Sequence, residues 1–140
     1  MSRMLWVAAG LAAAVAVVFG GIYALPDSKE EPVGGGGKAV AFDKALADKG
    51  KDVAASNGCT SCHSIDGSKS VGPSWKGTFG TQADIGGKQV PVDAAFITTA
   101  IEDPNAQVRS GFGAGMPSFK GKLSDEEIAA FVEYMKSLSG

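Results

Sequence analysis

The feature that most constrains this chain is the segment Gly-Cys-Thr-Ser-Cys-His at residues 58–63. It contains both cysteines and the single histidine of the 140-residue sequence. The spacing C-x-x-C-H is typical of covalent haem c attachment. In that chemistry Cys59 and Cys62 add to the two vinyl groups of one haem, and His63 supplies an axial nitrogen to the iron. We therefore predict one covalent haem c and exclude a second one.

Three other interpretations of the same residues explain less. A disulfide between Cys59 and Cys62 would close a very small loop and leave His63 unexplained. A thioredoxin-like redox pair needs a βαβ setting, which the surrounding sequence lacks. A zinc site needs a fourth ligand, and the chain has no other cysteine or histidine.

The single histidine leaves methionine as the remaining usual sixth ligand, a pairing that raises the haem potential. Of the four methionines, Met1 and Met4 belong to the amino-terminal segment. Met135 falls in an amphipathic stretch, where methionine more often packs in a core. Met116 occurs in Gly-Ala-Gly-Met-Pro-Ser-Phe, a loop defined by glycine and proline. We predict Met116 as the second iron ligand, the alternative being a methionine that fills a turn.

The amino terminus carries a long apolar segment. Residues 4–25 contain 19 apolar residues and no charge, enough to span a bilayer as a helix. A cleaved signal peptide is the alternative, but its apolar core is usually about 7–15 residues long. Arg3 precedes the segment and acidic residues follow it, so the positive-inside rule places the amino terminus in the cytoplasm. We therefore predict residues 1–25 to be a single-pass anchor (or uncleaved signal) in a bacterial inner membrane, with the rest on the periplasmic or outer face.

The remainder divides into a linker and one domain. Residues 26–41 contain charged residues, two prolines and four consecutive glycines, a composition typical of a flexible linker. Residues 42–140 are then the globular domain. Its core is poor in large aliphatic side chains, so it needs an additional stabilising group. The formal net charge of -2 gives no indication of nucleic-acid binding.

The domain is predicted to be all-α, with few helices around the haem. Before the haem motif, Phe42, Leu46 and Val53 fall on one helical face. Gly50 weakens a helix there, so its start is expected near Lys49.

Local signals also define the elements after the motif. Residues 84–90 suggest a short hairpin. Asp93 is predicted to cap a helix that ends before Pro104. Ser124 and Glu127 form a capping box at the start of an amphipathic carboxy-terminal helix.

Four features in this order, namely C-x-x-C-H, Val71-Gly72-Pro73, Gly115-Met116-Pro117 and the amphipathic last helix, resemble class I (cytochrome c-like) c-type cytochromes. The resemblance covers residues 47–139. More narrowly, GCTSCHSIDGSKSVGPSWKGTFG and IEDPNAQVRSGFGAGMPSF look like the haem c domain fused to subunit II of some haem–copper oxidases. The chain lacks room for that protein's cupredoxin domain and has no spare ligands for a dinuclear copper centre. It is therefore similar to the cytochrome domain alone, on its own membrane anchor.

The resemblance implies roles for further residues. Pro73 matches the proline whose carbonyl accepts a hydrogen bond from the axial histidine, the alternative being a plain turn proline. Trp75 occupies a haem-contacting position, although it could equally belong to the core. Phe112 and Phe119 flank the methionine loop and are expected to pack near the haem. Arg109 is expected either to pair with a haem propionate or to face solvent.

The resemblance also implies a function. We expect an electron carrier rather than an enzyme, which moves single electrons between respiratory (or photosynthetic) membrane complexes. Its expected partners are a quinol-oxidising complex and a terminal haem–copper oxidase. One alternative is a fixed haem c subunit of a larger complex. Another is a gas-binding or peroxidatic haem protein with an open sixth site. A hypothetical docking rim consists of Lys69, Lys76, Lys120 and Lys122.

Overall fold

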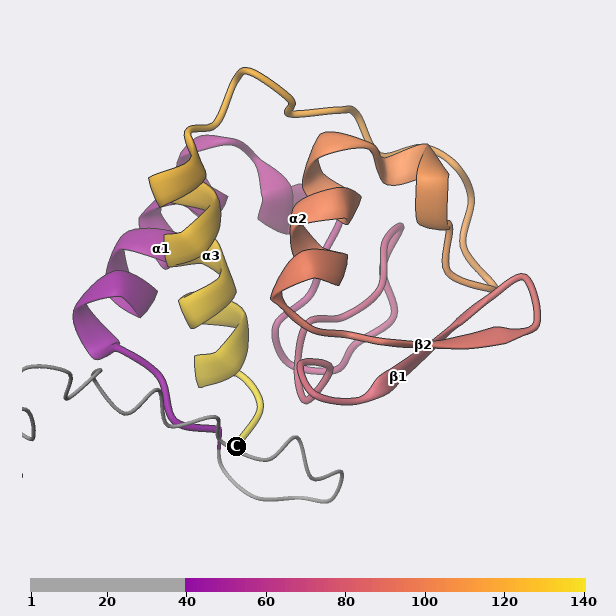
Figure 1. Cartoon of the computed structure of the whole chain (residues 1–140), viewed down its shortest axis with the longest axis horizontal. Coiled ribbons are helices and arrows are strands. Elements are labelled where there is room, and N and C mark those ends of the chain that lie inside the picture. Colours follow the sequence, from indigo (N-terminus) through magenta and orange to yellow (C-terminus); the bar gives the residue numbers. More distant parts are fainter. Residues whose placement is uncertain (1–39) are drawn as a thin grey trace, which may run out of the picture. The chain divides into compact units, whose positions relative to one another are not determined.

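The computed structural model describes residues 40–140 of the chain. The predicted anchor, and all but the last residues of the predicted linker, lie outside the described residues. No helix within residues 40–140 has the length and apolar character needed to cross a bilayer. This part of the chain consists of three α-helices, two 3-10 turns and one hairpin (Figure 1). Their bounds are α1 Lys44–Ser56, η1 Cys59–Ser61, β1 Gln82–Ile85, β2 Lys88–Pro91, α2 Ala94–Glu102, η2 Pro104–Gln107 and α3 Asp125–Ser137.

Helices α1 and α3 pack side by side, and Gly50 of α1 lies at their contact (Figure 1). A Cβ atom added at Gly50 would overlap the carbonyl oxygen of Ala130 and lie 2.8 Å from the backbone nitrogen of Phe131. Only glycine lets the two backbones approach this closely. The other buried residues of α1 are also small or medium-sized: Ala47, Val53 and Ala54.

Two predictions for this helix are wrong. The helix is continuous from Lys44 and does not begin near Lys49. Phe42 precedes the helix and is 45% exposed, and Leu46 is 41% exposed, so neither shares the buried face with Val53. The helix begins at Lys44 because the Asp43 carboxylate caps it by accepting the N–H of Leu46. Leu46 stays outside the buried face because the close packing of α3 on α1 favours small side chains in the contact.

The other elements begin and end where local signals predict. The Asp93 carboxylate accepts a hydrogen bond from the backbone N–H of Phe96, and α2 ends before Pro104. The predicted capping box of Ser124 and Glu127 is present at the start of α3. The backbone N–H of Ser124 bonds the Glu127 carboxylate and lowers its pKa. The stabilisation from this bond is therefore present at neutral pH and is lost as the pH falls through the lowered pKa.

The hairpin predicted for residues 84–90 is present over residues 82–91 and pairs β1 with β2 antiparallel, with Asp84 opposite Gln89. The predicted helical fold is thus confirmed, with this hairpin as its only sheet among residues 40–140. The core brings residues of the helices together with Trp75 and with residues on and beside the hairpin, and no large side chain in it is fully buried. Its members are Ala54, Trp75, Ala83, Val92, Ile97, Ile101, Ile128, Phe131, Val132, Tyr134 and Met135.

We predict that Gly50→Ala destabilises the protein, although alanine is the better helix former. The added methyl group must push α3 away from α1, and overpacking of this kind costs about 1–3 kcal/mol. The measurement is the free energy of unfolding of the haem-loaded protein in guanidinium chloride, followed by circular dichroism.

Lys51→Ala is the matched control, because Lys51 is exposed on the same helix. It is expected to change the free energy of unfolding by no more than about 0.5 kcal/mol. A Gly50→Ala protein as stable as the parent would contradict the close backbone packing.

Candidate haem-binding site

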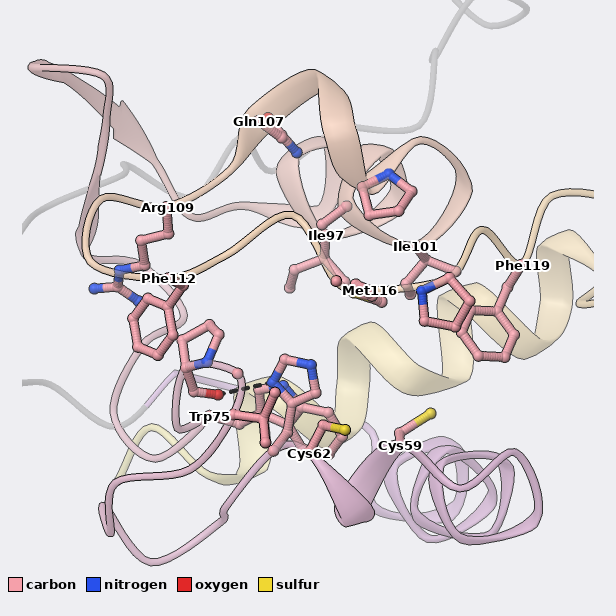
Figure 2. Close-up of a pocket in the computed structure, with 18 of the residues that line it drawn as sticks. Cys59, Cys62, Trp75, Ile97, Ile101, Gln107, Arg109, Phe112, Met116 and Phe119 are labelled. Carbon is pink, nitrogen blue, oxygen red and sulfur yellow. Dashed lines mark hydrogen bonds between the residues drawn. The ribbon is translucent and has the colours of Figure 1, made fainter.

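A cavity of about 290 Å³ lies between the C-x-x-C-H turn and the loop that follows η2 (Figure 2). This volume is close to the lower end of the range for ligand pockets, about 300–1,000 Å³. Residues of all three helices and of the loops 71–75 and 112–119 form its wall. Every residue that the sequence assigns to haem binding lines it: Cys59, Cys62, His63, Pro73, Trp75, Arg109, Phe112, Met116 and Phe119.

The haem motif itself is folded as one tight turn directly after α1. Gly58 starts the turn with φ of 69°, in the left-handed region that favours glycine. The Cys59 carbonyl then accepts hydrogen bonds from the N–H groups of Cys62 and His63, at 3.2 and 3.1 Å. This turn carries both thiols and the imidazole to the cavity wall from a single short segment.

Both cysteines are free thiols in the structure, so its geometry does not favour the disulfide alternative. Cys59 is half-buried, and burial raises the pKa of its thiol. A backbone hydrogen bond at Cys59 opposes part of that rise.

The imidazole of His63 is oriented by the backbone of Pro73. The Nδ1 atom lies 2.8 Å from the Pro73 carbonyl oxygen (dashed line in Figure 2). A carbonyl oxygen only accepts, so Nδ1 must carry the proton and donate this bond. The other ring nitrogen, Nε2, then keeps its lone pair free to bind a metal. This is the arrangement expected of a metal-ligating histidine, whose second nitrogen is bonded to a carbonyl.

Gly72 restricts the position of the same ring. A Cβ atom at Gly72 would lie 2.5 Å from Cε1, 2.8 Å from Nδ1 and 2.9 Å from Nε2 of His63. The N–H of Gly72 also donates to the Cys62 carbonyl at 2.7 Å, which ties this loop to the haem motif. No role for Gly72 was predicted from the sequence. The sequence feature that could have indicated a role for Gly72 is its position directly before Pro73, where the backbone passes the imidazole of His63.

Trp75 lies against the ring as well. Its indole stacks on the imidazole of His63, with the ring centroids 5.0 Å apart and the planes inclined by 18°. On another side it packs edge-on against Phe131 of α3, at 4.9 Å and 82°. Trp75 is buried, and it is both a wall of the cavity and part of the core. Trp75 therefore belongs to the core, and its contact with haem stays a prediction.

Met116 reaches the cavity from the opposite segment. In Figure 2 its side chain lies across the cavity from Cys62 and Trp75. It is half-buried and packs against the buried core. Three residues later, the N–H of Phe119 donates to the Ile101 carbonyl at 2.9 Å and fixes the loop to the end of α2. The cavity thus offers a nitrogen donor and a soft sulfur donor, which come from two separate segments.

The charge in the cavity is confined to one end. Arg109 is the only Lys, Arg, Asp or Glu among the described residues that line it. It is half-buried, and Figure 2 shows it beside Phe112, away from Met116 and Phe119. No ion pair involves Arg109 in residues 40–140. Arg109 is thus the one charged side chain placed to pair with a haem propionate, and that pairing and exposure to solvent both stay predictions.

These residues fit haem c. The cavity wall is largely apolar, the two thiols stand three positions apart, and His63 presents an unprotonated nitrogen. Comparison with known proteins points the same way. The family model described as cytochrome c matches residues 47–139. The chain is also similar to cytochrome c-551 of Stutzerimonas stutzeri, with 30% identity over 102 residues, which cover 73% of this chain and 88% of that protein.

We predict that Gly72→Ala disturbs the histidine side of the site. Its methyl group would collide with the ring of His63, so the bond between Nδ1 and the Pro73 carbonyl must lengthen or break. A lost outer hydrogen bond of this kind typically costs about 10–100-fold in metal affinity or activity. The expected result is a lower yield of haem-loaded protein and a shifted reduction potential, measured by spectroscopy and redox titration.

Gly113→Ala is the control. Gly113 lines the same cavity, but a Cβ atom there meets no protein atom within 4 Å. If Gly72→Ala and Gly113→Ala gave the same yield of haem-loaded protein and the same reduction potential, crowding of the His63 ring by residue 72 would not be the cause of the change.

Proposed function

Because the chain belongs to the cytochrome c family, we propose that it carries single electrons along a bacterial inner membrane to which it is tethered. Membership of the family makes the chain an electron carrier with covalent haem c, not an enzyme, and the single cysteine pair is consistent with one haem. The direction we propose is from a quinol-oxidising complex towards a terminal haem–copper oxidase. The proposed location of the haem domain is the periplasmic or outer face.

The observation that carries this function is the pair of donors at one cavity. His63 is held with Nε2 free, and Met116 lies across the same cavity. Haem c bound there supplies one-electron chemistry between ferric and ferrous iron. We propose that His63 and Met116 are the two side chains that would bind the iron of that haem. The residues of the wall exclude water, which limits the solvent rearrangement that accompanies each change of charge.

A gas-binding or peroxidatic protein is the less favoured alternative. Such a protein needs an open or labile sixth position, and here Met116 is the side chain available to fill it. The cavity also contains no second histidine and, among its described lining residues, no carboxylate that could serve as a general acid or base. Arg109 is the single charged group there. These observations support a site in which both His63 and Met116 would hold the iron, and they do not favour gas binding or peroxidatic chemistry.

Electron exchange is proposed to occur at the open side of the cavity beside the haem motif. Val71 lines the cavity and is 75% exposed, and Cys62 next to it is exposed as well. An exposed apolar edge of this kind suits a brief contact with a membrane complex. The four lysines of the hypothetical docking rim, Lys69, Lys76, Lys120 and Lys122, are all exposed. The chain carries a formal net charge of -2, so it has no broadly basic docking surface. The four lysines would therefore attract an acidic partner only locally.

The tether is proposed from the sequence of residues 1–41. A flexible linker over residues 26–41 would have a root-mean-square reach of about 22 Å. Confinement by such a linker gives effective concentrations of about millimolar near partners in the same membrane. The second candidate, a fixed subunit of a larger complex, is favoured by the small residues Gly10, Ala14, Gly20 and Gly21, which permit close helix contact.

We predict that Met116→His removes the long-wavelength absorption band that methionine gives ferric haem c. It should also lower the reduction potential, because methionine raises it relative to histidine. Met135→Leu is the control, since Met135 lines the same cavity from α3 and the exchange nearly conserves volume. This control should keep the band. A band retained in Met116→His and lost in Met135→Leu would contradict the assignment.

We predict that removal of residues 1–25 leaves the haem spectrum intact and slows electron delivery to membrane-bound oxidase. The measurement is oxygen consumption by membranes at equal bulk concentrations of the full and shortened proteins. With detergent-solubilised oxidase the two should react equally fast, because confinement is then lost. Unchanged turnover in membranes would argue against tethering, and co-purification with a complex in mild detergent would identify a fixed subunit instead.

A further inference from the structure

The loop that carries Met116 has little structure of its own. Residues 111–115 include three glycines, and most of them are exposed. The hydrogen bonds inside the loop span only a few residues, such as that from the N–H of Gly115 to the Gly113 carbonyl. A segment this rich in glycine has many accessible conformations. The position of Met116 is therefore decided by what holds the two ends of the loop.

The downstream end is attached to α2. Besides the bond from Phe119 to Ile101, the Ser118 hydroxyl donates to the Glu102 carbonyl. Both contacts lie within three residues of Met116, on its carboxy-terminal side. They leave the amino-terminal side of the loop unconstrained.

The upstream end is attached to the hairpin through one residue, Asp84 of β1. The Asp84 carbonyl accepts the N–H of Ser110 at 2.7 Å. The Asp84 carboxylate oxygen Oδ1 accepts the Ser110 hydroxyl at 3.0 Å and the N–H of Gly87 at 2.7 Å. Asp84 is half-buried. One side chain thus links the turn of the hairpin to the start of the methionine loop.

We propose that Asp84 is a positioning residue for the methionine loop. By holding Ser110, it fixes the upstream end of residues 111–118 and keeps Met116 at the cavity. It thereby sets how readily an external ligand replaces Met116 on the iron. This inference rests on the proposed ligation by Met116, and it gives the hairpin a role at the site beyond its place in the fold.

The test uses imidazole as the probe ligand of the ferric, haem-loaded protein. Asp84→Ala removes the bond from the Ser110 hydroxyl and the bond from Gly87 inside the hairpin turn, while the backbone bond from Ser110 to the residue 84 carbonyl remains. Loss of the one side-chain bond that holds the loop should raise the affinity for imidazole about fivefold. Asp84→Asn keeps an oxygen that accepts both bonds and should stay within about twofold of the parent. Ser110→Ala loses the same side-chain contact between the loop and the hairpin, so it should raise the affinity about as much as Asp84→Ala does.

Gly86→Ala separates positioning from hairpin stability. Gly86 has φ of 59°, so alanine strains the same turn, yet its Cβ meets nothing within 4 Å and the contact between Asp84 and Ser110 remains. This variant should leave the affinity for imidazole within about twofold of the parent. If Gly86→Ala raises the affinity as much as Asp84→Ala does, the effect belongs to the hairpin as a whole and the inference is overturned.

Hydrogen exchange of residues 108–118 gives a readout that does not depend on the iron. It should be faster in Asp84→Ala than in the parent and in Gly86→Ala, while exchange in α1 and α3 is unchanged. A parent protein without the methionine band would refute ligation by Met116, and the exchange rates alone would then decide whether Asp84 holds the loop. Equal exchange in Asp84→Ala and the parent would overturn the inference in either case.

Discussion

The site depends first on the confinement of one imidazole ring. The Pro73 carbonyl fixes the proton on Nδ1 of His63, and the backbone of Gly72 passes so close that no side chain fits between them. Trp75 covers a face of the ring and is itself braced by Phe131 of α3. The orientation of the proposed iron ligand is therefore set by the packing of the helical frame, in addition to the local turn that carries it.

Helices α1 and α3 and the residues of the site consequently pack together as one unit. Helix α3 reaches α1 closely because Gly50 has no side chain, and α1 leads directly into the turn with both thiols. The same α3 supplies Phe131, which supports Trp75 from the other side. A core that contains no fully buried large side chain gains stability from a covalently held group in its cavity. Thioether links from Cys59 and Cys62 would hold that group in the cavity.

The sequence predicted those features that depend on neighbouring residues. The caps at Asp93 and Ser124, the hairpin and the C-x-x-C-H turn are encoded within a few positions and are present. The start of α1 was predicted wrongly because the Asp43 cap, whose carboxylate accepts the N–H of Leu46, was overlooked. The exposure of Leu46 was missed because it depends on the packing of α3, some 80 residues away in the chain. Gly72 was missed for a related reason. Its role becomes visible only when the ring of His63 is seen against it.

The two proposed ligands are held in different ways, and this difference has a consequence for function. His63 is enclosed by a carbonyl, a glycine backbone and an indole, so it has almost no room to move. Met116 stands in a loop whose stretch before it is rich in glycine, and its position depends on contacts at the two ends of that loop. Any ligand exchange at the iron should therefore take place on the methionine side. The ease with which another ligand displaces Met116 is then governed by how firmly the methionine loop is attached. His63 keeps its position throughout, because its surroundings leave the ring no room to move.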